Sequence, residues 1–302
     1  MKKIVVFHEI YNLKVFKKTI FLLKKNFKFV SLNSLISSND NNLCHITFDD
    51  AHFTFINAFE FLKKQQIPTT LFLSIDKINK KNNFWFQDID YINNQLKDEF
   101  DKEFNNHFNV HDNKKKFNSL EIIKSFNIDK IHDFIKIIKS KYKLNIPYVN
   151  ISLNEMEKLK NEKLLDFGAH TMNHPILANE SSEKANYEIK KSIDELEIFL
   201  QRKTTTFAYP NGIVDLDFTK REKDILKINN IKYAFTMNLD SYNEDKFDNY
   251  EIPRISFGEN LFKNYLINKN VNFYKKISNI NIPFLRSTEN YRRLQLKKIL
   301  YK

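Results

Sequence analysis

The sequence contains only three glycines in 302 residues, Gly168, Gly212 and Gly258. No glycine-rich loop of the kinds that cradle nucleotide phosphates occurs, so the common nucleotide-binding sites are disfavoured. The single cysteine, Cys44, excludes an internal disulfide and a cysteine-based zinc cluster. Cys44 lies in an apolar run, where a buried and reduced thiol is expected.

Long apolar runs are also lacking. The N-terminal stretch Ile4–Phe7 is too short for the apolar part of a signal peptide or for a membrane span. No later segment approaches the length of a membrane helix. We therefore expect a cytoplasmic protein.

Hydrophobic residues make up 42% of the chain and aromatic residues 14%, enough for a sizeable folded core. The net charge of +12 comes mostly from lysines scattered along the sequence. This scatter argues against a nucleic-acid partner. The basic C-terminal tail leaves a weak peripheral contact with a membrane open.

Apolar runs with strand character alternate with helical patterns, which predicts a parallel sheet or barrel. Residues from about 78 to 147 break this alternation, since they are rich in Lys and Asn with helical stretches at 117–126 and 131–142, and we interpret them as a helical insertion. Trp85 in this insertion is expected to anchor a helix, with stacking on a sugar ring as the alternative. The expected strands are 4–7, 29–32, 43–48, 69–74, 165–169, 205–209, 233–236 and 252–257.

Two pairs of residues have the chemistry of a metal site. Asp49 and Asp50 follow an apolar strand, at the end where parallel sheets bind ligands, and adjacent carboxylates there favour a cation. His170 and His174 are spaced so that a helix or tight turn can aim both rings at one point. Each pair has a structural alternative, a helix cap for the aspartates and two satisfied loop residues for the histidines.

Together the pairs make a stronger case. Two histidines and one carboxylate give three protein ligands and leave a position open for water, as in catalytic metal sites. The second aspartate is then free to act as a base. Imidazole and carboxylate ligands suit zinc or another divalent transition metal.

The ordered set TFDD at 47–50, HTMNHP at 170–175 and FAYPNG at 207–212 resembles the polysaccharide deacetylase family, also called the NodB-homology or carbohydrate esterase 4 family. The resemblance covers about residues 1–80 and 150–258. By position, Asp49 resembles the family's catalytic base, and Asp50, His170 and His174 resemble its metal ligands. Asn211 occupies the position whose backbone N–H helps to hold the oxyanion.

The chain departs from the family pattern at two functional positions. Ala208 stands where the third motif often has an arginine that orients the base, and Arg254 is our candidate substitute, with a surface ion pair as the alternative. No histidine follows His174 to serve as the usual general acid. One branch of the family supplies this acid from the first strand. His8, at the end of such a strand, is therefore our candidate, with a core or cap histidine as the alternative.

The resemblance implies a distorted (β/α)7-type barrel at residues 1–258, with the insertion at about 78–147 and a basic helical tail at 259–302. An open doubly wound sheet is the alternative fold. The implied function is metal-dependent removal of N-acetyl groups from an amino sugar or glycan. Because no secretion signal is evident, a cytoplasmic, lipid-linked or nucleotide-linked intermediate of surface polysaccharide synthesis is expected as substrate. The alternatives are another C–N amide hydrolase, such as a sugar deformylase, and a catalytically inactive glycan-binding protein.

Overall fold

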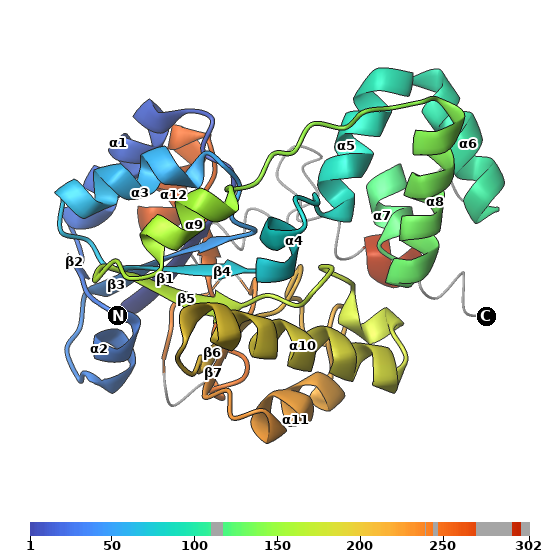
Figure 1. Ribbon diagram of the computed structural model, residues 1–302. Coiled ribbons are helices and arrows are strands. Elements are labelled where there is room, and N and C mark those ends of the chain that lie inside the picture. The colour runs from blue at the N-terminus through green and yellow to red at the C-terminus, as the bar shows by residue number, and fades with distance from the viewer. Residues whose placement is uncertain (110–116, 239, 244–246, 270–291, 297–302) are drawn as a thin grey trace.

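A computed structural model of the chain describes residues 1–109, 117–238, 240–243, 247–269 and 292–296 (Figure 1). A curved parallel sheet lies in the larger part of the molecule with helices around it, and a bundle of helices lies to one side. Within the described ranges, no helix is both long and apolar enough to cross a membrane.

The sheet is parallel at every pairing between its strands. Seven of the described strands follow the order β7-β6-β5-β4-β3-β1-β8, and the short β2 pairs beside β3. Their bounds are β1 (Lys2–Phe7), β2 (Lys28–Phe29), β3 (Leu43–Asp49), β4 (Thr69–Leu73), β5 (Leu165–Ala169), β6 (Thr206–Ala208), β7 (Tyr233–Phe235) and β8 (Ile255–Ser256).

The segment before β8 connects the two edges of this sheet. Ile252 forms a parallel bridge with Phe235 of β7, whereas β8 itself pairs with β1. Pro253 lies between these pairings and has no N–H to donate, so the strand expected at 252–257 is reduced to two residues. The strand order runs round without the reversal that defines a doubly wound sheet. The fold is therefore the predicted distorted (β/α)7-type barrel, and the open-sheet alternative is wrong.

Side chains of β3 alternate between the two faces of the strand. Ile46 and Phe48 pack in the hydrophobic core between sheet and helices. Thr47 and Asp49 point the other way, where both contact the side chain of Arg254. The barrel interior therefore carries polar groups that lead towards the carboxyl edge of the sheet.

Helices cover the outside of the sheet, with α1, α3, α9 and α12 on one side and α10 and α11 on another (Figure 1). Several begin at a capping side chain: Asn12 accepts a hydrogen bond from Val15 N, and Ser181 accepts one from Lys184 N. The bounds are α1 (Leu13–Lys24), α2 (Leu32–Ser37), α3 (Phe55–Lys64), α4 (Ile75–Asn79), α9 (Leu153–Leu159), η1 (Leu177–Asn179), α10 (Ser182–Leu200), α11 (Lys220–Ile228) and α12 (Leu261–Lys269).

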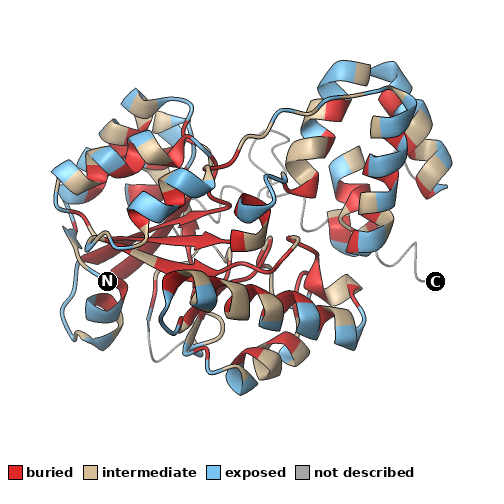
Figure 2. Cartoon of the chain, viewed as in Figure 1, coloured by how far each residue is buried: buried red, intermediate tan, exposed pale blue. Residues whose placement is uncertain are grey.

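After α4, the described residues of the insertion form four helices with a hydrophobic core of their own. These are α5 (Trp85–Leu96), α6 (Asp98–Phe108), α7 (Ser119–Ile123) and α8 (Ile128–Lys141). Their buried apolar residues form a cluster separate from the core of the barrel, and Figure 2 shows the buried positions on these helices apart from those of the sheet. Leu296, from the helical residues 292–296, also packs in this core. Apart from these residues and the segment that ends with α12, the predicted tail lies outside the described residues. The division into domains stays a prediction.

Candidate metal and catalytic site

The two aspartates lie at the carboxyl end of β3. Asp49 is its last residue, and Asp50 begins a turn with a φ of 69°, followed by Ala51 with a φ of 56°. Aspartate adopts this left-handed conformation more readily than most residues. The turn separates the neighbouring carboxylates, so that Asp49 contacts Arg254 and Asp50 contacts His170.

A tight loop after β5 brings the two histidines together. The ring centroids of His170 and His174 are 4.9 Å apart. Thr171 and His174 have φ values of 61° and 57°, and the N–H of His174 donates a hydrogen bond to Oγ1 of Thr171. The spacing of four residues is therefore realised in a turn, one of the two conformations expected.

Glu188 of α10 holds the middle of this loop. Its carboxylate is fully buried and accepts hydrogen bonds from Met172 N, Asn173 N and Asn173 Nδ2, at 3.0, 2.8 and 2.7 Å. Trp85, the first residue of α5, donates from Nε1 to the carbonyl oxygen of His174 at 2.8 Å. Trp85 thus anchors its helix, as expected, and ties the insertion to the histidine loop.

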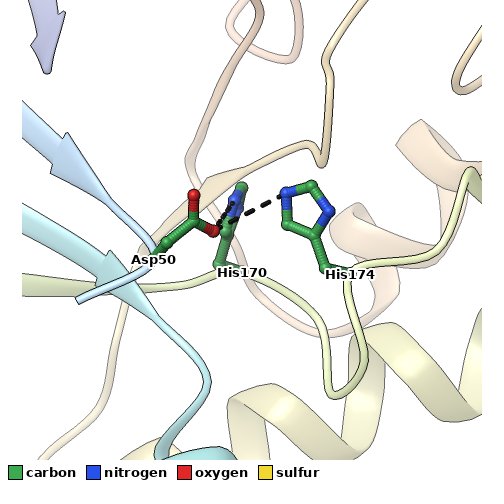
Figure 3. A group of neighbouring side chains, drawn as sticks. All are labelled: Asp50, His170 and His174. Atoms are coloured by element: carbon green, nitrogen blue, oxygen red, sulfur yellow. Dashed lines mark ion pairs between the residues drawn. The ribbon is translucent and has the colours of Figure 1, made fainter. Parts of the chain in front are cut away.

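Asp50, His170 and His174 form one compact group (Figure 3). Oδ1 of Asp50 is 3.5 Å from Nε2 of His170 and 3.6 Å from Nε2 of His174. Ligand atoms about 2.1 Å from a tetrahedral metal are about 3.4 Å from one another. Oδ1 of Asp50 is also buried with no hydrogen-bond partner among the described residues. These three residues therefore fit a divalent transition metal.

The protonation of the imidazoles also suits a metal. Nδ1 of His170 is 2.7 Å from the carbonyl oxygen of Ala208, so Nδ1 carries an N–H and Nε2 faces Asp50. Burial lowers the pKa of His170, but Asp50 and Asp49 outweigh it and raise the pKa, so a bound cation would take the place of a proton at Nε2. Burial lowers the pKa of His174 to about 3, and its ring is neutral at pH 7. Burial raises the pKa of Asp50, but the two imidazoles overcome this and hold it below its usual value.

Asp49 is paired with Arg254. Nη1 and Nη2 of Arg254 donate to the two carboxylate oxygens of Asp49, each at 2.7 Å, and the arginine is 0% exposed. Burial opposes ionisation of Asp49, yet the guanidinium charge and its hydrogen bonds keep the pKa of Asp49 below the usual value. The structure thus places Arg254 against the aspartate that the sequence assigns as base, and excludes the surface ion pair.

His8 and Asn211 face the same space as the metal group. Nε2 of His8 is 3.9 Å from Oδ2 of Asp49, and the His8 side chain is 33% exposed. Asn211 has a φ of 58°, and its Nδ2 is buried without a described hydrogen-bond partner. A cavity of about 320 Å³, which we call the reaction cavity, is lined by both residues together with Asp49, Asp50, His170 and His174.

Sequence reasoning missed several residues around this cavity. Phe86, Leu120 and Lys124 come from the insertion, and helical periodicity indicated which residues are buried there but not what they face. Glu188 did leave a signal. It lies on the buried stripe of α10, three residues after Ala185 and four before Ser192, where a charge needs a partner.

The profile of the polysaccharide deacetylase family matches residues 37–234 of the chain. Comparison with curated proteins finds no match.

Solved structures of deacetylases have a similar fold. IcaB from Ammonifex degensii superposes with a TM-score of 0.59 at 14% identity, covering 89% of this chain and 97% of that chain. The Streptococcus pyogenes deacetylase PplD, in complex with acetate, has a TM-score of 0.55 at 17% identity, covering 85% and 92%. A de-N-acetylase from Aggregatibacter actinomycetemcomitans has a TM-score of 0.55 at 10% identity, covering 87% and 99%.

Proposed function

The chain belongs to the polysaccharide deacetylase family and is a carbohydrate de-N-acetylase, and we propose that it works with a divalent transition metal, zinc being the first candidate. Asp50, His170 and His174 would hold the metal. When bound, it would act as a Lewis acid towards water and the amide carbonyl. The proposal also gives Asp49, His8 and Asn211 of the reaction cavity a defined task.

One observation carries the proposal: a second buried carboxylate lies beside the three-ligand group and is not part of it. Asp49 is held by Arg254, which keeps it ionised and fixes both of its oxygens. A positioned carboxylate that is not consumed by metal binding is what a general base requires. Asp49 would accept a proton from the attacking water.

His8 would supply the proton that the leaving nitrogen needs. The water oxygen adds to the carbonyl carbon, the C–N bond breaks, and the nitrogen takes a proton as acetate and an amine form. Among the described residues, three histidines line the reaction cavity: His8, His170 and His174. The last two are assigned to the metal, which leaves His8 to supply the proton. Its Nε2 is close enough to Asp49 for both to serve one substrate group.

Asn211 would stabilise the charge that develops on the carbonyl oxygen. Its left-handed backbone is fixed in the turn between Pro210 and Gly212, at the edge of the reaction cavity. A fixed N–H donor aimed at such an oxyanion typically contributes about 3 kcal/mol to the lowering of the barrier.

We propose an N-acetylated sugar as substrate, in the form of a lipid-linked or nucleotide-linked intermediate of surface polysaccharide synthesis. The family match supports the sugar, and the link to a lipid or a nucleotide stays a prediction. The cytoplasmic location and the weak membrane contact through the basic tail stay predictions. Most of that tail lies outside the described residues.

Acetate release combined with metal analysis tests the proposal. Asp49→Ala should keep the metal and lose turnover on N-acetylglucosamine oligomers and UDP-N-acetylglucosamine, whereas His174→Ala should lose the metal. Asp98→Ala, an exposed carboxylate of α6, is the control and should behave like the wild type. Release of formate from N-formyl sugars in place of acetate would favour a deformylase. Bound metal with neither product would favour a glycan-binding protein.

A further inference from the structure

A second cavity adjoins the reaction cavity. It has a volume of about 500 Å³, and we call it the side cavity. Phe86 and Leu120 line both cavities. Two chain segments also pass from one to the other, because His8 lines the first and Glu9 the second, and Asp50 the first and His52 the second.

The helical insertion and the barrel build the side cavity together. Helix α5 contributes Phe86, Asp90 and Tyr91, while the segment after β1 contributes Glu9 and Tyr11. The volume lies within the range of about 300–1,000 Å³ that is usual for small-molecule sites. A ligand that reached from the reaction cavity into the side cavity would therefore contact this chain's insertion as well as its barrel.

Tyr11 offers an exposed aromatic face at this site. Its side chain is 69% exposed, while its ring packs edge-on against His52 with centroids 5.4 Å apart. His52 is buried, and its Nδ1 is 2.8 Å from Oγ1 of Thr54. The tyrosine ring thus has support on one side and remains available to a ligand, as an apolar platform or as a partner for a cation.

The charge around Tyr11 is negative, although the whole chain carries +12. Glu9 and Asp90 line the side cavity, and Glu259 lies close by. Partial burial raises the pKa of Tyr11, and these three carboxylates raise it further. The side cavity therefore favours a positively charged ligand, although the net charge of the whole protein would repel one.

The reaction itself supplies such a ligand. Removing an N-acetyl group from a sugar leaves a primary amine, which is protonated near neutral pH. On the basis of the proposed function, and for a lipid-linked glycan of several residues as the substrate, we propose that the side cavity binds a sugar residue with a free, protonated amine, next to the acetylated residue in the reaction cavity. Glu9 and Asp90 would attract the ammonium group, and Tyr11 would pack on the sugar ring.

This arrangement would make the enzyme favour glycans that are already partly deacetylated. A first turnover creates an amine, and moving the chain by one residue would place that amine in the side cavity. Successive turnovers on one chain would then be easier than the first.

Direct binding tests the inference without any turnover. The probes are β-1,4- and β-1,6-linked trimers of glucosamine, compared with the corresponding N-acetylglucosamine trimers on the metal-free protein by titration calorimetry. For at least one linkage, the glucosamine trimer should bind about fivefold or more tightly than its acetylated form. Added salt should reduce the difference, because Glu9 is half-buried and Asp90 is exposed.

Variants identify the site of binding. The double variant Glu9→Gln/Asp90→Asn should lose most of the preference for the glucosamine trimer. Tyr11→Ala should raise the dissociation constant of both trimers about fivefold. Asp98→Asn and Tyr187→Ala are the matched controls, since both residues are exposed and line neither cavity. Equal binding of the two trimers, or a preference that survives in the double variant, would overturn the inference. Failure of the proposed function would show separately, as absence of acetate release by the wild type.

Discussion

Arg254 is a fully buried cation. Among the described carboxylates, only that of Asp49 lies within hydrogen-bond distance of it and balances its charge. Removing one partner of a buried ion pair leaves the other charge without compensation. We therefore expect Arg254→Ala to lower the free energy of unfolding by about 3–5 kcal/mol. Urea unfolding followed by circular dichroism measures this loss.

The double variant Asp49→Ala/Arg254→Ala should regain part of the stability that Arg254→Ala loses, because no unpaired charge remains. Arg202→Ala is the control: its ion pair with Asp166 is exposed on both sides and should contribute no more than about 1 kcal/mol. Equal losses for Arg254→Ala and Arg202→Ala would contradict this account of the pair.

Single residues were predictable where a strand end or a short motif fixed them. Asp50, His170 and His174 were expected at one point because β3 and β5 end at the same edge of the sheet, and they lie there. Arg254 had two interpretations, since sequence could not show whether its side chain enters the barrel or the solvent. The catalytic roles of Asp49, His8 and Asn211 stay predictions.

At the scale of elements, α10 and the histidine loop depend on each other through Glu188. Replacing Glu188 with alanine removes three hydrogen bonds from Met172 and Asn173. We expect the dissociation constant for zinc to rise about 10- to 100-fold, because the residues that orient metal ligands typically have effects of this size. Competition with a chromophoric chelator measures it.

Glu195→Gln is the matched control for Glu188, since Glu195 lies on the same helix and pairs with Lys191 near the surface. Its zinc affinity should equal that of the wild type. If Glu188→Ala binds zinc as tightly as Glu195→Gln does, the loop does not need this anchor.

A second link between elements joins the barrel to α8. Burial raises the pKa of Glu180 to about 7, and its carboxyl group accepts a hydrogen bond from Ile128 N at 2.7 Å. In the unfolded chain a glutamate has a pKa of about 4.3. Between about pH 4.3 and 7 the folded protein therefore keeps a proton that the unfolded chain has lost, and this residue's contribution to stability falls as pH rises.

Glu180→Gln should consequently gain stability relative to the wild type as the pH is raised from 5 to 8. Urea unfolding of both proteins at the two pH values gives the comparison. Parallel pH dependences would show that Glu180 titrates normally in the folded state.

The elements themselves followed from periodicity and turn residues, within limits. The helix expected at 131–142 is α8 (Ile128–Lys141), which begins earlier because Asn127 caps it. The strand expected at 252–257 is shorter because its two ends pair with different strands on either side of Pro253. Such differences arise from tertiary pairing, which the local pattern does not contain.

For the molecule as a whole, residues 292–296 join the barrel and the insertion. Arg293 is buried and pairs with Asp217, which follows β6 in the chain, while Leu296 lies in the core of the insertion. Arg293→Ala should lower the free energy of unfolding by about 3–5 kcal/mol, since it leaves the buried carboxylate of Asp217 without its counter-charge. Thermal and urea unfolding measure the change, again with Arg202→Ala as the exposed control.

A loss for Arg293→Ala no larger than that of the control would show that these residues do not hold the two parts together.

The fold and the family were predictable from the sequence, because motif order and strand alternation determine both. The packing of residues 292–296 was not, because five residues hold too little pattern to indicate a distant partner.

Arg254 enters the polypeptide 205 positions after the aspartate it neutralises. At about 5–20 residues per second, the ribosome adds it about 10–40 s later. During translation, the strand that ends in Asp49 can therefore form before its counter-charge exists. The nascent barrel must keep that carboxylate hydrated or protonated until Arg254 leaves the ribosome. Asp49 can therefore be positioned as a base only after the last described strand, β8, has been released.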